Sequence, residues 1–162
     1  MKVLVTGGAG YIGSVLVDNL ITEGHQVRVI DDLSNGFAEN VHKNAIFISG
    51  SILDNSTLND ALNGVEAVLH LAAKIRVEEG ESNPDLYKNV NVEGTLKLLK
   101  LCKEKGVKKF VFASTAAVYG DPEDFPVTEK LCATVLSLPM HTEMDEETLK
   151  YITDNLLELI GK

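Results

Sequence analysis

Three glycines spaced three residues apart are the first feature of this sequence that could do chemistry. Gly7, Gly10 and Gly13 lie in the stretch VTGGAGYIGS, which follows a β-rich run and opens a helical pattern. In that context Gly7 permits a tight turn, Gly10 lets the backbone approach a pyrophosphate, and Gly13 lets the helix pack closely. The helix N-terminus then offers N–H groups to the anion. The spacing predicts a dinucleotide cradle, and the alternative is a glycine-rich turn that binds nothing.

Two adjacent carboxylates, Asp31 and Asp32, end the second β-rich run. Asp31 lies about 20 residues past the glycines, where a carboxylate accepts hydrogen bonds from the hydroxyls of an adenosine ribose. Its charge would also repel the 2′-phosphate of NADP, and no arginine follows closely, so NAD is the favoured cofactor. The pair could instead serve acid/base chemistry or solvate a loop. The position favours ribose binding for Asp31, whereas the role of Asp32 stays open.

These residues need a scaffold, and the apolar pattern of the chain predicts one. Predicted strands alternate with predicted helices, the strands at 2–7, 26–31, 45–50, 67–73 and 108–115 and the helices at 11–24, 56–64 and 84–106. Such alternation favours a parallel sheet with helices on both faces. We therefore predict an α/β fold, a truncated Rossmann-like doubly wound sheet of about five strands in the order 3-2-1-4-5, with the switch point between strands 1 and 4.

The character of the sequence changes after Thr115. Residues 116–143 hold three of the four prolines and no clear period, which indicates loop. Residues 145–162 have the apolar spacing of an amphipathic helix. We expect a nucleotide-binding domain over 1–130 and, over 131–162, a loop and a C-terminal helix packed on that domain rather than a second domain.

Composition and charge limit the partners. The chain has 162 residues and a net charge of −9, and an acidic surface repels nucleic acid and anionic lipid. No apolar run approaches the roughly 18 residues of a membrane span, and the first residues are too short a run for a secretion signal. The histidines have no ligand-like spacing and the two cysteines are far apart in sequence. We expect a cytoplasmic protein with reduced thiols and no metal site.

Five motifs occur in the order and spacing of a known family: VTGGAGYIGS, VIDDLSNG, HLAA, NVNVEGT and FASTAAVYGD. Residues 1 to about 129 resemble the N-terminal part of the NAD-dependent nucleotide-sugar epimerases and dehydratases, within the extended short-chain dehydrogenase/reductase family. UDP-glucose 4-epimerases are the members that they resemble most. Five ordered motifs are far more specific than one glycine loop.

The resemblance implies a role for each matching residue. Tyr11 and Ile12 would offer backbone N–H groups to the pyrophosphate, and Asn91 would brace the loop along the nicotinamide half. Thr115 would hydrogen-bond the sugar hydroxyl that is oxidised. The implied cofactor-binding residues are the three glycines together with Tyr11, Ile12, Asp31, Asp32, Ser34, Asn35, Gly36, Ser51, Ile52, Ala72, Ala73, Lys74 and Asn91.

Two positions depart from the family pattern. The family usually has Asp where Ser51 stands, in contact with adenine, although a hydroxyl can still accept a hydrogen bond. The family's catalysis uses a Tyr followed four residues later by Lys, whose charge lowers the tyrosine pKa so that the phenolate takes the sugar hydroxyl proton. After Glu129 no such pair occurs. The sequence for the sugar-nucleotide lobe is missing as well.

The tail has a resemblance of its own. Residues 136–159, LSLPMHTEMDEETLKYITDNLLEL, resemble the C-terminal end of PLP-dependent sugar aminotransferases, without the lysine that carries PLP in those enzymes. We expect this tail to be a graft, from a fusion or deletion of natural or engineered origin. Its helix would cover apolar surface left by the truncated sheet.

The resulting prediction is an NAD-binding domain of a nucleotide-sugar epimerase/dehydratase-like protein that does not catalyse on its own. Three alternatives stay open: a UDP-sugar epimerase or dehydratase completed by a partner chain, a non-catalytic dinucleotide-sensing module, and a relic whose cradle binds nothing. NAD is the expected ligand, while a sugar nucleotide and a homodimer through the long helix stay open.

Overall fold

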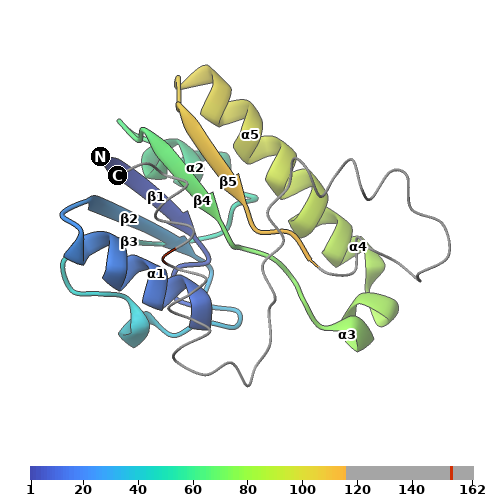
Figure 1. Ribbon diagram of the computed structural model, residues 1–162. Coiled ribbons are helices and arrows are strands. Elements are labelled where there is room, and N and C mark those ends of the chain that lie inside the picture. Colours follow the sequence, from blue (N-terminus) through green and yellow to red (C-terminus); the bar gives the residue numbers. More distant parts are fainter. Residues whose placement is uncertain (116–153, 155–162) are drawn as a thin grey trace, which may run out of the picture.

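The computed structural model describes residues 1–115 and residue 154. In this part of the chain five parallel strands form one sheet in the order β3-β2-β1-β4-β5, which confirms the predicted order (Figure 1). The strands are β1 (Lys2–Thr6), β2 (Gln26–Asp31), β3 (Ile46–Ser49), β4 (Ala67–His70) and β5 (Lys109–Phe112).

Helices cover both faces of the sheet (Figure 1). Successive side chains of a strand point to opposite faces, so an apolar strand gives both faces an apolar surface to bury. Val3 and Val5 of β1 pack with Leu16 of helix α1 (Tyr11–Thr22), whereas Leu4 belongs to a second cluster with Leu58 and Leu98. This second cluster joins the sheet to α2 (Asn55–Ala61) and α5 (Thr95–Glu104), which lie on the face opposite α1 (Figure 1). The near-continuous apolar strands follow from this double cover.

The strand order reverses at the centre of the sheet. β1 pairs with β2 on one side and with β4 on the other, so that Thr6 lies in register with both Ile30 and His70. From β1 the chain passes through α1 to β2 and then to β3, on one side of β1. After β3 the chain crosses to the other side of β1, where β4 and β5 lie. A crevice is expected where such connections diverge, at the carboxyl ends of the strands.

The predicted long helix over 84–106 differs from the structure in its hydrogen-bond pattern. It divides into α4 (Pro84–Tyr87), a π-helical stretch η2 (Lys88–Gly94) and α5. The Thr95 hydroxyl donates to the carbonyl of Asn91 at 2.8 Å, which gives that carbonyl a side-chain partner at the end of the π-helical stretch. Two short elements were not predicted, α3 (Val77–Ser82) and the 3₁₀ turn η1 (Ala38–Asn40), and neither buries a residue that would give it an apolar period.

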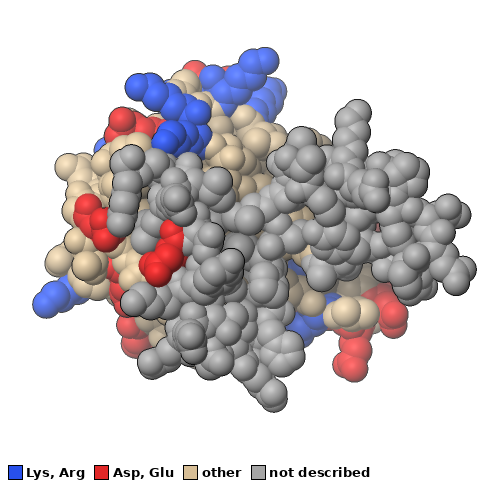
Figure 2. All heavy atoms as spheres, viewed as in Figure 1, with Lys and Arg blue, Asp and Glu red and all other residues tan. Residues whose placement is uncertain are grey.

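Charge is distributed unevenly over the described surface. Exposed lysines gather where α5 ends and β5 begins (Figure 2), and they are Lys100, Lys103, Lys105, Lys108 and Lys109. This is the edge of the sheet where the strands begin, opposite to the edge where the crevice is expected. The lysine cluster therefore contributes nothing to that crevice.

Several predictions lie outside the described residues: the loop over 116–143, the helix over 145–162, the aminotransferase-like tail and the domain division at residue 130. Within residues 1–115, no helix has the length and apolarity that a membrane crossing requires. The same part of the chain holds no group of three or more His, Cys, Asp or Glu side chains able to bind a metal ion.

Candidate functional site: a cavity at the strand switch point

A cavity of about 730 Å³ opens at the carboxyl ends of the strands, a volume within the usual range of ligand sites. Its wall comes from the turn after β1, the end of β2 and its loop, the residues after β3 and the loop after β4. The predicted residues that line it are Gly7, Gly10, Tyr11, Ile12, Gly13, Asp31, Asp32, Ser34, Asn35, Gly36, Ser51, Ile52, Ala72, Ala73 and Lys74.

The three glycines differ in what a side chain would meet. Gly7 has φ +73°, and a Cβ there would lie 2.8 Å from the backbone nitrogen of Ala72. At Gly13 a Cβ would overlap the carbonyl oxygen of Gly7, so this glycine lets α1 pack against the turn itself. At Gly10 a Cβ would meet only the Gly7 oxygen, at 3.3 Å. Gly10 therefore leaves open space at the cavity wall, as a cradle for a pyrophosphate requires.

Helix α1 begins directly at this wall. Its N-cap residue is Gly10, which has no side chain to cap the helix, and Ser14 makes the next backbone hydrogen bond, to the Gly10 carbonyl at 2.9 Å. The first N–H groups of an α-helix lack partners within the helix and carry partial positive charge. The cavity therefore has an anion-attracting surface at Tyr11 and Ile12.

Asp31 lines the cavity and also braces the glycine turn. Its Oδ2 accepts the N–H of Ala9 at 3.0 Å, and its Oδ1 accepts the N–H of Leu33 at 2.9 Å. Because each carboxylate oxygen has two lone pairs, one on each remains for a ligand hydroxyl. Leu33 is held at φ +59°, a left-handed conformation that is uncommon for a residue with a side chain. Asp31 thus stabilises a turn that would otherwise be strained.

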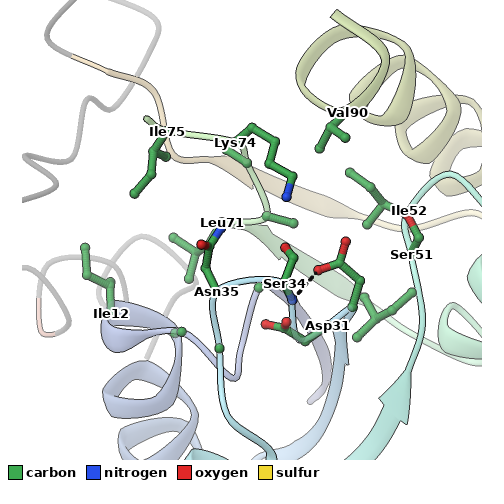
Figure 3. Close-up of a pocket in the computed structure, with 18 of the residues that line it drawn as sticks. Ile12, Asp31, Ser34, Asn35, Ser51, Ile52, Leu71, Lys74, Ile75 and Val90 are labelled. Carbon is green, nitrogen blue, oxygen red and sulfur yellow. Dashed lines mark hydrogen bonds between the residues drawn. The ribbon is translucent and has the colours of Figure 1, made fainter. Parts of the chain in front are cut away.

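Asp32 closes the other side of that turn. Its Oδ1 accepts the N–H of Ser34 at 3.0 Å, which Figure 3 marks with a dashed line. Gly36 follows, where a Cβ would lie 2.7 Å from the carbonyl of Ala9, and the N–H of Phe37 donates to that carbonyl at 3.2 Å. The loop after β2 is therefore packed directly on the glycine turn, and both line the same cavity.

The loop after β4 forms the opposite wall. Lys74 makes two backbone hydrogen bonds to the side chain of Asn91, its N–H to Oδ1 at 2.8 Å and its carbonyl from Nδ2 at 2.9 Å. Asn91 does not itself line the cavity, and its side chain holds the backbone of a residue that does. With its backbone held in this way, Lys74 directs its side chain into the cavity (Figure 3).

His70, for which the sequence predicted no role, lies behind this wall in a hydrogen-bonded chain. Thr6 Oγ1 is 2.6 Å from His70 Nδ1, and His70 Nε2 is 2.8 Å from Thr95 Oγ1. Thr6 Oγ1 already accepts the N–H groups of Leu71 and Ala72, so its own hydrogen goes to Nδ1. The Thr95 hydrogen goes to the Asn91 carbonyl, so Nε2 carries the imidazole hydrogen.

The surroundings of His70 favour its neutral form. The side chain is 1% exposed, and burial lowers its pKa from 6.5 to about 4. The chain of bonds joins the end of β1, the end of β4 and the start of α5, and it holds the backbone of Leu71 and Ala72, two residues of the cavity wall. The signals in the sequence were a histidine at the end of an apolar strand and its place in the HLAA motif, and neither indicated these partners.

The wall after β3 is formed by Ser51 and Ile52. Ser51 Oγ accepts the N–H of Leu53 at 3.2 Å. Ile52 is buried against Gly94, where a Cβ would lie 2.8 Å from its Cδ1. Sequence reasoning missed Gly94, whose lack of a side chain lets η2 approach this wall. Further lining residues that it missed are Ile30, Gly50, Leu71, Ile75, Arg76 and Val90.

Two hydroxyl groups bear on possible catalysis. Thr115, the predicted contact of a sugar hydroxyl, is exposed after β5 and is not among the residues that line the cavity.

The hydroxyl of Tyr87 lies 2.5 Å from the Arg76 carbonyl and 3.1 Å from Glu79 Oε2. Burial and the neighbouring Glu79 raise the Tyr87 pKa, the opposite of what a phenolate base requires.

Known proteins are similar to this chain in sequence and in fold. The sequence pattern of the NAD dependent epimerase/dehydratase family matches residues 3–140. A UDP-glucose 4-epimerase of Streptomyces lividans is 43% identical over 131 residues, which are 79% of this chain and 40% of that protein. A UDP-glucose 4-epimerase sequence of Klebsiella pneumoniae is 41% identical over 138 residues, which are 80% of this chain and 99% of that sequence.

Solved structures of UDP-glucose 4-epimerases have a fold similar to that of this chain. A UDP-glucose 4-epimerase of Thermotoga maritima, solved with UDP-glucose, has a TM-score of 0.74 and 38% identity over 98% of this chain and 50% of its own. A UDP-glucose 4-epimerase of Thermus thermophilus, solved with NAD, has a TM-score of 0.72 and 35% identity over 99% of this chain and 51% of its own. Against full-length relatives such as the Streptomyces lividans protein, the chain spans about 40% of their length. The chain belongs to the NAD-dependent epimerase/dehydratase family.

Proposed function

We propose that this chain binds NAD in the cavity, as the cofactor-binding domain of a nucleotide-sugar epimerase/dehydratase-like protein, and that it does not catalyse on its own. The observation that carries the proposal is the meeting of a glycine-rich turn, a helix N-terminus and a buried carboxylate in one wall. These groups suit a pyrophosphate and a ribose. Gly10 supports the fit, because the space that its Cβ would take is open.

The order of the lining residues along the cavity wall supports one orientation of bound NAD. The pyrophosphate would lie on the N–H groups of Tyr11 and Ile12, and the adenosine ribose on Asp31, with the loop of Asp32, Ser34, Asn35 and Gly36 around it. The nicotinamide half would lie along Ala72, Ala73 and Lys74, whose loop Asn91 braces. Bound NAD would accept the hydride of the sugar carbon that carries the oxidised hydroxyl, and Thr115 would hydrogen-bond that hydroxyl.

The lack of independent catalysis rests on the sequence. After Glu129 no Tyr is followed four residues later by Lys. A general base is typically worth about 10²–10⁴ in rate. The chain also covers only about half of the Thermotoga maritima enzyme that was solved with UDP-glucose.

Two alternatives share the NAD site. A partner chain that carries the missing pair could complete the active site, whereas a homodimer through the long helix is a separate proposal, since a second copy lacks the same pair. A dinucleotide-sensing module would need no chemistry. Both predict NAD binding, so the cofactor is tested first.

Titration calorimetry of the purified chain with NAD and with NADP tests the cofactor. We expect one NAD per chain and NADP weaker by roughly tenfold or more, because the Asp31 carboxylate would repel the 2′-phosphate. NAD at 100 times its Kd should stabilise the fold by about 2.7 kcal/mol in a thermal or urea melt. Equal affinity for both dinucleotides would contradict the ribose role of Asp31. No heat with millimolar NAD would contradict the cofactor proposal itself.

A further inference from the structure

Ser51 lies where the base of a bound dinucleotide would lie. Along the sheet, the turn after β1 is followed by the end of β2 and then by the end of β3. In the ligand, the pyrophosphate is followed by the ribose and then by the base, in the same order. The N–H of Gly50 donates to the Asp31 carbonyl at 2.9 Å, so the residues after β3 adjoin the ribose position directly. This placement rests on the proposed function.

The hydroxyl of Ser51 is only partly used by the protein. Its oxygen accepts the N–H of Leu53 at 3.2 Å, which occupies one of two lone pairs. Among the contacts of the described residues, this is the only hydrogen bond of that hydroxyl. Its hydrogen and its second lone pair remain for the cavity, beside the apolar side chain of Ile52.

We propose that the base subsite accepts purines whether position 6 carries an amino group or an oxo group. An adenine amino group donates, and the second lone pair of the Ser51 oxygen can accept from it. A hypoxanthine oxo group accepts, and the Ser51 hydroxyl can rotate to donate to it. A carboxylate in this place could only accept, and it would repel an oxo group. Ser51 is thus a specificity-determining residue that makes the site permissive.

The test compares NAD with nicotinamide hypoxanthine dinucleotide, whose purine carries an oxo group at position 6 and a hydrogen on N1. Because the N1 hydrogen is the same for every variant, the change in the ratio of the two Kd values between variants reports on residue 51. Calorimetry gives both Kd values for the wild type, Ser51→Asp and Ser51→Asn. The ratio of the two Kd values is taken within each protein, so a variant that is less stable still reports its own preference. Asn matches Asp in shape, but its amide can either donate or accept.

For the wild type and Ser51→Asn we expect the two Kd values to agree within about threefold. For Ser51→Asp we expect NAD to bind roughly tenfold or more tightly than the hypoxanthine analogue, since an oxo group would face an acceptor. A wild type that already prefers NAD by that margin overturns the inference and leaves the NAD site standing. Binding of neither dinucleotide overturns the proposed function, and the inference with it.

Discussion

At the scale of single residues, the carboxylate of Asp31 serves both the protein and the proposed ligand. Its distance from the glycines along the chain was enough to predict its place at the cavity. Its bond to Ala9 was not predictable, because it joins residues 22 positions apart whose proximity depends on the folded sheet. The same holds for His70, since its two threonine partners lie 64 and 25 residues away.

The buried His70 gives a prediction about pH. With a folded-state pKa of about 4 against 6.5, the unfolded chain binds more protons between these values. The contribution to stability is therefore complete above pH 6.5 and is lost as the pH falls toward 4. Its size is on the order of 3 kcal/mol. Urea unfolding of the wild type and of His70→Gln at several pH values measures it.

The comparison between the two proteins separates His70 from the carboxylates that titrate in the same range. The stability advantage of the wild type over His70→Gln should shrink as the pH falls from 7 to 4. An advantage that stays constant over that range would show that His70 is not held neutral.

At the scale of elements, the alternation of β-rich and helical runs was enough to predict the strand order. Three elements, η2, α3 and η1, escaped prediction, and neither α3 nor η1 buries a residue. The π-helical stretch η2 contains Asn91, whose carbonyl accepts the Thr95 hydroxyl and whose side chain binds the backbone of Lys74. Neither bond changes the apolar period of the helix, so the period predicted an ordinary α-helix. The α3 segment buries no residue and leaves no period to detect.

The junction of β1 and α1 gives a prediction with two matched variants. In Gly13→Ala the new Cβ would overlap the Gly7 carbonyl, so the helix must move, and we expect a loss of at least about 1–3 kcal/mol in the free energy of unfolding. In Gly10→Ala the new Cβ meets only one atom of the fold, at 3.3 Å. We expect a smaller loss of stability there, with NAD binding strongly weakened.

Urea melts and NAD titrations of both variants give the two readouts. If Gly10→Ala bound NAD as the wild type does, the pyrophosphate could not lie against this turn. If Gly13→Ala were as stable as the wild type, α1 would not depend on its close approach to the turn.

At the scale of the whole molecule, the chain spans about 40% of relatives such as the Streptomyces lividans protein, and an assay tests the proposal that it does not catalyse on its own. The described residues supply a cavity wall but bring Thr115 to no part of it. We expect the purified chain with NAD to convert no UDP-galactose to UDP-glucose, since after Glu129 no Tyr is followed four residues later by Lys. A coupled assay that consumes UDP-glucose measures this directly.

Turnover in that assay would contradict the non-catalytic proposal. The Thr115→Ala variant then shows whether the chain's own site is responsible. Activity that falls with the variant would assign the chemistry to this chain, whereas activity that persists would indicate a contaminating enzyme.

The hydrogen bonds around Ala9 have a further consequence for how a ligand would be received. Its N–H is held by Asp31, and its carbonyl accepts both the N–H of Phe37 and Nδ2 of Asn40, at 3.2 and 3.1 Å. The tip of the glycine turn is thus preorganised by three bonds from another part of the chain. Binding need not spend conformational entropy to shape it. The Ala9 amide proton would exchange with solvent only when the loop after β2 opens.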